Sequence, residues 1–393
     1  MRRKKKEKIM DSITQRFRIG TEFISHENGT HPNFHIIGGD FGNSANKIWG
    51  PHGMSRFPGF AIQLGQFAEV HPLPSTIRVE DLDSGEMWLV GAQAQNGLSP
   101  DDKTISEEEQ YSRYRWHSRM FRILVMASIG STIRDKGDMA KHILLQTALP
   151  DDEMREDRAE FRDVLAGRYH FRLSLGDGDF REFNFEIEKK NIYVMEQARA
   201  TLFSACMDSA MNATPDRERI MTKNTMVLDG GFGTLNVYPF KAGVLQKGLT
   251  YRNLGMARIL HETSERFSSQ YGVRVPVPAM QSSLEKGTIR VRLKGGRGSK
   301  EQPFGDILEA ASKNICSEAL DSIDRAFGFM HYDNIILGGG TCAAWEDQIR
   351  EELRDYEGLQ VISAGRNESV DPVFTNSRGL FEYRYLKTYS KEG

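Results

Sequence analysis

Residues 35–48 read His-Ile-Ile-Gly-Gly-Asp-Phe-Gly-Asn-Ser-Ala-Asn-Lys-Ile, an apolar stretch that runs into an acid, a glycine and a lysine. The pattern predicts a strand that ends near Asp40, a turn, and a returning strand that carries Lys47. A buried aspartate is unfavourable unless a cation faces it, and a hydrated metal ion is a natural partner. Gly42 would let backbone amides approach a phosphate, and Lys47 would add positive charge. The stretch therefore predicts a phosphate-binding hairpin, with an ordinary strand and turn as the alternative.

A second stretch of the same kind lies far along the chain. Residues 225–228 are apolar and run into Asp-Gly-Gly-Phe-Gly-Thr at 229–234, after which 235–238 continue as a strand. The first stretch, Asp-x-Gly-x-x-x-x-Lys at 40–47, is not a P-loop, in which a helix N-terminus receives the phosphate. Two hairpins with an aspartate entering each can face one nucleotide from opposite sides and share a metal ion between their carboxylates.

A third glycine-rich element follows the buried strand predicted at 333–337. It reads Gly338-Gly339-Gly340-Thr341 and precedes a helix predicted at 343–356. Bare backbone at three glycines would let a flat ring lie against it. A tight strand-to-helix turn explains the same residues equally well.

Length and composition limit the class of protein. With 393 residues we expect two domains, and 52 Lys and Arg against 54 Asp and Glu leave no global field for nucleic acid or membrane. Three widely spaced cysteines without a Cys-x-x-Cys pair are typical of a reduced compartment. No apolar run is long enough to span a membrane and no secretion signal is present, so we expect a cytoplasmic protein.

The N-terminus is basic. Residues 2–8 read Arg-Arg-Lys-Lys-Lys-Glu-Lys, and no strong apolar pattern precedes Phe34. We expect residues 1–30 to form a disordered arm outside the fold. Contact of this arm with DNA through phosphate charge is the alternative.

The remaining pattern alternates strands and helices, which predicts an α/β fold. We expect an antiparallel meander over 34–90, with a long helix at 105–130 packed on it, and a buried parallel strand at 142–148. The further expected elements are a helix at 151–165, a hairpin at 169–187, a strand at 191–195, helices at 198–210, 254–268 and 303–326, a strand at 289–293 followed by a loop at 294–298, a strand at 359–363 and a last helix from 371.

The order of the three glycine-containing elements resembles the actin, sugar-kinase and heat-shock-chaperone ATPase superfamily, with its phosphate-one, phosphate-two and adenosine motifs. The likeness runs from about residue 34 to the end. Four stretches are similar to bacterial and plasmid actin-like proteins of the ParM/StbA group: Gly-Asp-Phe-Gly-Asn-Ser-Ala-Asn-Lys at 39–47, Val-Gly-Ala-Gln-Ala at 90–94, Gly-Met-Ala-Arg at 255–258 and Phe-Thr-Asn-Ser-Arg-Gly-Leu at 374–380.

The resemblance implies an actin-like two-domain ATPase fold with the nucleotide in the interdomain cleft. Domain I would comprise 31–208 and 368–393, and domain II 209–367. Asp40 and Asp229 would hold Mg²⁺ through water. The other residues implied for nucleotide binding are Gly42, Asn43, Ser44 and Lys47 in the first hairpin, Gly231, Gly233 and Thr234 in the second, and Gly338, Gly339, Gly340 and Thr341 at the adenosine.

The residue that positions the attacking water lies, in these families, at the end of the strand before the interdomain helix. Here Glu196 and Gln197 compete for this catalytic role, and the alignment favours Gln197. An amide can orient water without carrying a proton away, which suits slow hydrolysis. The chain departs from the family in three places: Glu196 replaces the usual hinge proline, the second hairpin ends Thr-Leu-Asn rather than Thr-x-Asp, and the basic arm is an addition.

The function implied is nucleotide-dependent assembly into a homopolymer filament, with ATP, or GTP in its place, hydrolysed slowly. Its use would be plasmid or DNA segregation through a DNA-binding adaptor. A small-molecule kinase of the same superfamily is the alternative, and it would need a carboxylate base such as Asp208 or Glu196. A chaperone-like module would need a peptide-binding domain after the ATPase, and the chain stops at Gly393.

Overall fold

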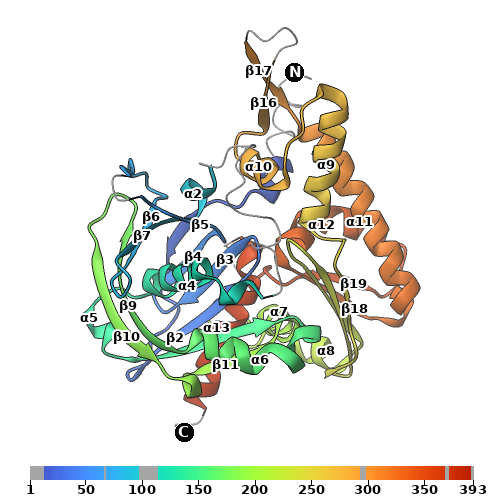
Figure 1. Ribbon diagram of the computed structural model, residues 1–393. Helices are drawn as coiled ribbons and strands as arrows, with labels where there is room; N and C mark the ends of the chain where they lie inside the picture. Colours follow the sequence, from blue (N-terminus) through green and yellow to red (C-terminus); the bar gives the residue numbers. More distant parts are fainter. Residues whose placement is uncertain (1–12, 66–67, 97–113, 293–297, 368–370, 391–393) are drawn as a thin grey trace. The chain divides into compact units, whose positions relative to one another are not determined.

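The computed structural model describes residues 13–65, 68–96, 114–292, 298–367 and 371–390. They form an α/β fold that separates into two compact units (Figure 1). Unit I contains the described residues between Ile19 and Thr214 and those from Ala364 onward, and unit II contains residues 13–18 and the described part of Pro215–Ser363.

Unit I is built on a six-stranded sheet. Its strands, in spatial order, are β1 (Glu22–Ser25), β4 (Gly53–Pro58), β3 (Ala45–Gly50), β2 (Phe34–Phe41), β8 (His142–Leu149) and β11 (Ile192–Glu196). Strand β8 pairs in parallel with β2 and with β11, as its continuous apolar run predicts. The carboxyl ends of these three strands therefore lie at one edge of the sheet.

A second sheet of unit I is antiparallel and five-stranded. Its strands, in spatial order, are β10 (Arg181–Ile187), β9 (Gly167–Leu175), β6 (Ile77–Asp81), β7 (Glu86–Val90) and β5 (Ala61–Gln63). The single meander predicted over 34–90 is therefore wrong, because β2 to β4 and β5 to β7 belong to different sheets. Helix α4 (Arg119–Thr132) shares one apolar core with both sheets. This helix begins well after residue 105, and residues 105–113 lie outside the described chain.

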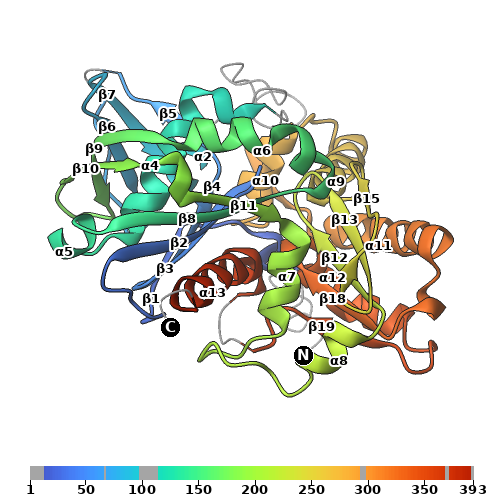
Figure 2. The same ribbon diagram turned by 90° about the horizontal axis from the view of Figure 1, so that it is seen from below.

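Helices α7 (Gln197–Ala205) and α13 (Thr375–Tyr389) pack against each other, and α13 also packs on β2 (Figure 2). The contact is close, because a Cβ on Gly379 would lie 2.0 Å from the carbonyl oxygen of Ala200. Arg378 is buried, donates to the carbonyls of Met207 and Asp208, and pairs with Glu382. The stretch at 374–380 is therefore a packing motif that also holds the segment following α7.

Unit II contains another six-stranded sheet. Its strands are β14 (Val244–Leu245), β13 (Leu235–Lys241), β12 (Thr225–Gly230), β18 (Asn334–Gly338) and β19 (Gln360–Ser363), with β15 (Leu249–Tyr251) also paired to β13. Strands β12, β18 and β19 are parallel. Helix α12 (Gly339–Glu352) packs on this sheet, and α11 (Gly305–Phe327) packs on α12 and on α9 (Met256–Tyr271).

A strand that the sequence pattern did not predict follows the loop predicted at 294–298. Strand β16 (Thr288–Arg292) pairs antiparallel with β17 (Ser299–Pro303), so a two-stranded hairpin precedes α11. Residues 294–297 lie outside the described chain, so the predicted loop stays untested there.

The predicted N-terminal arm is too long. Residues 13–17 are helical, and Phe17 is buried. Arg16 and Arg18 pair with Asp347 and Glu285 of unit II, at 3.2 and 3.0 Å. Strand β1 then pairs with β4 in unit I. Residues 1–12 of the predicted arm, which hold the basic cluster, lie outside the described chain, so the prediction stays untested there.

The other described elements are short helices and the longer helix α6. They are α2 (Ala92–Asn96), η1 (Arg115–His117), α5 (Lys136–Met139), α6 (Asp151–Leu165), η2 (Lys189–Asn191), α8 (Arg217–Thr222), α10 (Val277–Ser283), η3 (Phe329–His331) and η4 (Pro372–Phe374). Helix α6 has the predicted bounds. No helix in the described part of the chain is long and apolar enough to cross a membrane.

Candidate functional site

The first hairpin, residues 40–47, joins β2 to β3 in unit I. Asp40 lies directly opposite Lys47 in the ladder, and Lys47 Nζ donates to Asp40 Oδ2 at 3.0 Å. The two side chains are only 7% and 15% exposed. Lys47 is thus the cation that compensates the buried carboxylate, so burial of Asp40 does not by itself require a metal ion. The role of Asp40 as a metal ligand stays a prediction.

The turn of this hairpin has no room for a side chain at its first position. A Cβ on Gly42 would lie 2.9 Å from the carbonyl oxygen of Ala45 and 3.1 Å from Lys47 Nζ. Behind the turn, the amide of Gly59 donates to the carbonyl of Ser44 at 2.8 Å. Gly42, Asn43 and Ser44 thus form a turn of defined shape next to a lysine.

Arg115, which the sequence did not single out, also contacts this turn. Its Nε donates to Asn43 Oδ1 at 2.5 Å, and a terminal nitrogen donates to the carbonyl of Phe41. Burial lowers the pKa of Arg115 to about 10, although Asp40 and Glu153 act in the opposite direction. The guanidinium therefore stays cationic at neutral pH, and the first hairpin has two cations against it. No motif in the sequence marked Arg115, which stands in the run Tyr-Arg-Trp-His at 114–117.

Glu196 and Gln197 lie at the same edge of the sheet as Asp40. In the register of the sheet, Thr147 of β8 lies beside Gly39 of β2 on one side and beside Val194 of β11 on the other. The ends of β2 and β11 are therefore level. Glu196 pairs with Arg199 at 3.0 Å. Gln197 is the first residue of α7. Its side-chain amide forms no hydrogen bond with any described residue. The pairing of Glu196 favours Gln197 as the residue available to a water molecule.

The second hairpin, residues 229–236, joins β12 to β13 in unit II. Asp229 lies opposite Asn236, and the amide of Gly231 donates to the carbonyl of Thr234 at 2.8 Å. A Cβ on Gly231 would lie 3.5 Å from that carbonyl, an ordinary contact. The protein alone therefore tolerates a side chain at Gly231, unlike at Gly42.

The triple glycine lies against this hairpin. Gly338 pairs with Asp229 in the parallel ladder, and Gly339 has a left-handed φ of 74°. A Cβ on Gly339 would lie 2.6 Å from Asp229 Oδ1. Thr341 Oγ1 donates to the carbonyl of Gly231 at 2.7 Å. Thr341 therefore holds the second hairpin, and α12 begins at Gly339, inside the glycine run rather than at 343.

The stretch at 255–258 also supports the second hairpin. Gly255 precedes α9, and a Cβ there would lie 2.5 Å from the carbonyl oxygen of Phe232. The first amides of α9 donate to the hairpin, with Ala257 bonding Phe232 at 2.8 Å. The N-termini of α9 and α12 thus both meet the hairpin, and helix N-termini carry positive partial charge.

The structure therefore brings the predicted residues together in two groups. Asp40, Gly42, Asn43, Ser44 and Lys47 form the group of unit I, with Glu196 and Gln197 at the same sheet edge. The group of unit II contains Asp229, Gly231, Gly233, Thr234 and the residues 338–341.

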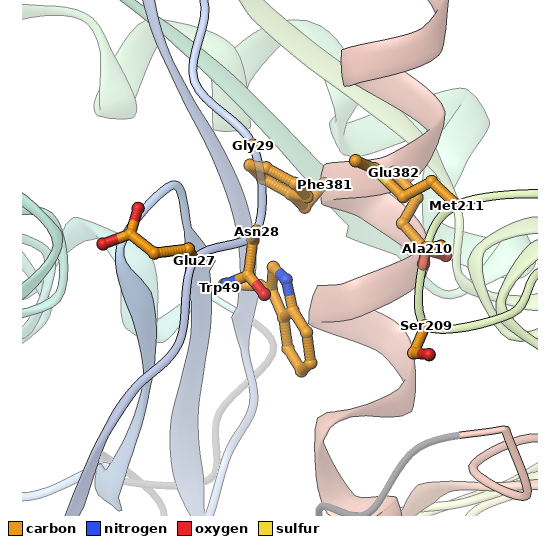
Figure 3. A pocket seen from close by; sticks show the side chains of 9 residues that line it. All are labelled: Glu27, Asn28, Gly29, Trp49, Ser209, Ala210, Met211, Phe381 and Glu382. Carbon is orange, nitrogen blue, oxygen red and sulfur yellow. The ribbon is translucent and has the colours of Figure 1, made fainter.

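A separate pocket of about 150 Å³ lies in unit I (Figure 3). It is smaller than ordinary ligand pockets. Its Glu27 pairs with His52 and Arg134, and its Glu382 pairs with Arg378, so both carboxylates are compensated within the protein. None of its lining residues was predicted for the site: Glu27, Asn28, Gly29, Trp49, Ser209, Ala210, Met211, Phe381 and Glu382.

Comparison with known proteins gives a match in structure only. No family model and no curated protein matches the sequence. The pCBH ParM, solved as a non-polymerisable quadruple mutant, is 18% identical, with a TM-score of 0.69 over 90% of this chain and 100% of that one. The chain has the actin-like ATPase fold.

Two other structures with this fold show its range. ParM in a 15-stranded filament from Clostridium botulinum is 17% identical, with a TM-score of 0.67 over 90% of this chain and 99% of that one. The actin-like protein Alp7A is 13% identical, with a TM-score of 0.64 over 91% of this chain and 99% of that one. The fold predicted from the three glycine elements is confirmed.

Proposed function

We propose that this actin-like chain is a nucleotide-dependent, filament-forming ATPase. The observation that supports this most is a pair of equivalent hairpins, one in each unit. In each hairpin an aspartate is the second-last residue of the first strand, and the turn begins with a glycine two positions after it. The same fold occurs in the 15-stranded ParM filament.

The residues of both hairpins fit a Mg²⁺-bound triphosphate. Carboxylate oxygens suit Mg²⁺, which usually keeps several water ligands. Asn236 Oδ1 is buried opposite Asp229 and has no hydrogen-bond partner among the described residues. A metal-bound water would supply the donor that this oxygen lacks.

Each predicted residue then has a role in the proposal. Asp40 and Asp229 hold Mg²⁺ through water, and the ion neutralises phosphate charge. Lys47 and the turn amides of both hairpins bind the phosphates, and the glycines 338–340 lie against the adenosine of ATP, or against guanosine if GTP is used. Gln197 orients the attacking water, which is compatible with slow hydrolysis.

Assembly follows if the triphosphate favours a subunit shape that adds to a polymer, with hydrolysis weakening the contacts. The chain would serve in the cytoplasm to move or space DNA, such as a plasmid bound through an adaptor protein. Sedimentation and light scattering of the purified chain with Mg²⁺ and a slowly hydrolysed ATP analogue test this. We expect assembly above a critical concentration, and its absence in every nucleotide would overturn the proposal.

The residues proposed as the base of a sugar-type kinase are occupied. Asp208 accepts hydrogen bonds from the backbone of Asn212 and Ala210, which lower its pKa, and Glu196 pairs with Arg199. Asp208 thus caps a turn. Phosphoryl transfer to a sugar in a coupled assay would restore this alternative.

The basic residues 2–8 allow filaments to touch DNA without an adaptor. A deletion of residues 1–30 would remove β1 and the helical segment before it, so a deletion of residues 2–12 is the sharper test. DNA retention that is unchanged across a salt series would dismiss direct contact.

A further inference from the structure

We propose that Arg115 is a positioning residue for nucleotide binding, which holds the turn of the first hairpin in its phosphate-binding shape and adds a second cation beside it. This inference rests on the proposed function and assigns a role to a residue that neither the motifs nor the resemblance includes.

The backbone around Arg115 is anchored in the core of unit I. The next residue, Trp116, is 5% exposed and packs on Phe161 with ring centroids 5.3 Å apart. Ser118 caps the following helix by accepting from the amide of Phe121. The guanidinium carbon of Arg115 lies 5.6 Å from the Phe121 ring centroid, a cation–π contact. The side chain therefore extends from a firm base toward the hairpin.

Its two contacts flank Gly42 on both sides. One is the carbonyl of Phe41, the last strand residue, and the other is the side chain of Asn43, inside the turn. A guanidinium holds donors in a rigid fork, whereas an ammonium is a point charge. Arginine can thus set the distance between these two groups, and lysine cannot.

Charge near the hairpin also favours this role. Asp40 is paired with Lys47, so the lysine charge is partly used within the protein. Arg115 supplies a further positive charge next to the same turn. A polyphosphate that binds the turn amides would meet both cations.

The test compares Arg115→Gln and Arg115→Lys with Arg134→Gln in the full chain. Arg134 is a matched control, since it is also in unit I but is 58% exposed and pairs only with surface acids. The measured quantities are the Kd values of Mg-ATP and Mg-ADP, the hydrolysis rate, and the thermal midpoint without nucleotide. We expect R115Q to raise both Kd values about tenfold or more and R115K to fall between R115Q and wild type. R134Q should stay within about twofold.

If Arg115 only stabilised the fold, R115Q would lower the thermal midpoint, but its effect on nucleotide Kd would not depend on Asn43. The double variant N43A/R115Q distinguishes a structural role from a positioning role, because substitutions of residues that act together have non-additive effects on Kd. We expect its Kd to lie within about twofold of R115Q alone, whereas multiplied losses would overturn the inference.

Failure of this inference is distinct from failure of the proposed function. If wild type binds neither nucleotide, the proposed function falls. If wild type binds and R115Q binds equally well, only the role of Arg115 falls. Should R115Q not fold, R115K still decides, since it keeps the positive charge but loses the two-point contact, and binding equal to wild type would overturn the inference.

Discussion

The two hairpins carry an aspartate at the same place and differ in the residue opposite it. In unit I Asp40 faces Lys47, and in unit II Asp229 faces Asn236, each seven residues further along the chain. The first acid is neutralised by an ion pair, whereas the second faces a neutral amide.

The groups that hold the two hairpins in place also differ. Side chains, those of Lys47 and Arg115, hold the first hairpin. The second is held by the amides at the N-terminus of α9 and by the Thr341 hydroxyl of α12, and glycines allow both helix ends to approach it. Equivalent turns can thus be made electropositive either by cationic side chains or by helix ends. Substitutions in the two hairpins should therefore have different effects on stability and nucleotide binding.

The largest expected effect is that of Gly339→Ala, compared with Gly231→Ala. Gly339 is left-handed, and its Cβ would lie 2.4 Å from the carbonyl oxygen of Gly230. We expect G339A to lower the free energy of unfolding by about 3 kcal/mol, and G231A by about 0.5 kcal/mol. Urea unfolding measures both.

The same pair of variants separates folding from binding. Because the protein has room at Gly231, any loss of nucleotide affinity in G231A reports the approach of a ligand. Equal destabilisation by the two variants would contradict the account of a backbone-supported hairpin.

Asn236→Asp should give the next largest effect. It introduces the aspartate that the resemblance expects here, directly opposite Asp229, and like charges in a buried ladder repel. We expect a loss of about 2 kcal/mol of unfolding free energy in EDTA, with Mg²⁺ restoring more in the variant than in wild type. Chemical denaturation with and without Mg²⁺ checks this. Indifference to Mg²⁺ would argue against a metal at Asp229.

Lys47→Gln tests the ion pair of the first hairpin. It leaves the buried carboxylate of Asp40 without its cation, so we expect a loss of about 1 to 2 kcal/mol of unfolding free energy. The double variant Asp40→Asn with Lys47→Gln should recover part of that loss. A double-mutant cycle with no coupling would show that the pair contributes nothing.

Lowering the pH should reduce stability through strand β2 of the first hairpin. The second hairpin should not contribute to this loss. His35 lies on β2, where burial lowers its pKa to about 4 despite Asp138 at 3.9 Å, with His52, Lys141 and Asp135 also nearby. As the pH falls below 6.5, His35 is protonated in the unfolded chain but stays neutral in the folded chain, so the unfolded chain is favoured. We expect stability to be complete above pH 6.5 and about 1 kcal/mol lower at pH 5.5.

Urea unfolding at pH 7.5 and 5.5 measures this smallest effect. His35→Gln should remove most of the pH dependence, even if it lowers stability overall. A variant that keeps the wild-type slope would assign the dependence to other groups.

Much of the fold followed from local pattern. The bounds of α6, the run of β8 and the hairpin of β9 and β10 agree with the prediction, because each has a strong apolar period or clear turn residues. The division of 34–90 between two sheets was missed, since strand partners are chosen by tertiary packing. The helical segment before β1 was missed because its apolar residues are few and their partners lie far along the chain.

The sequence by itself determined the two acidic turns, the triple glycine and their order, because glycine and aspartate at strand ends have few structural substitutes. Only the tertiary structure decided what stands behind those turns. Arg115 reaches its turn from a segment about 70 residues away along the chain, and Thr341 reaches its turn from more than 100 residues away. Such contacts depend on how distant elements pack, which no local pattern encodes.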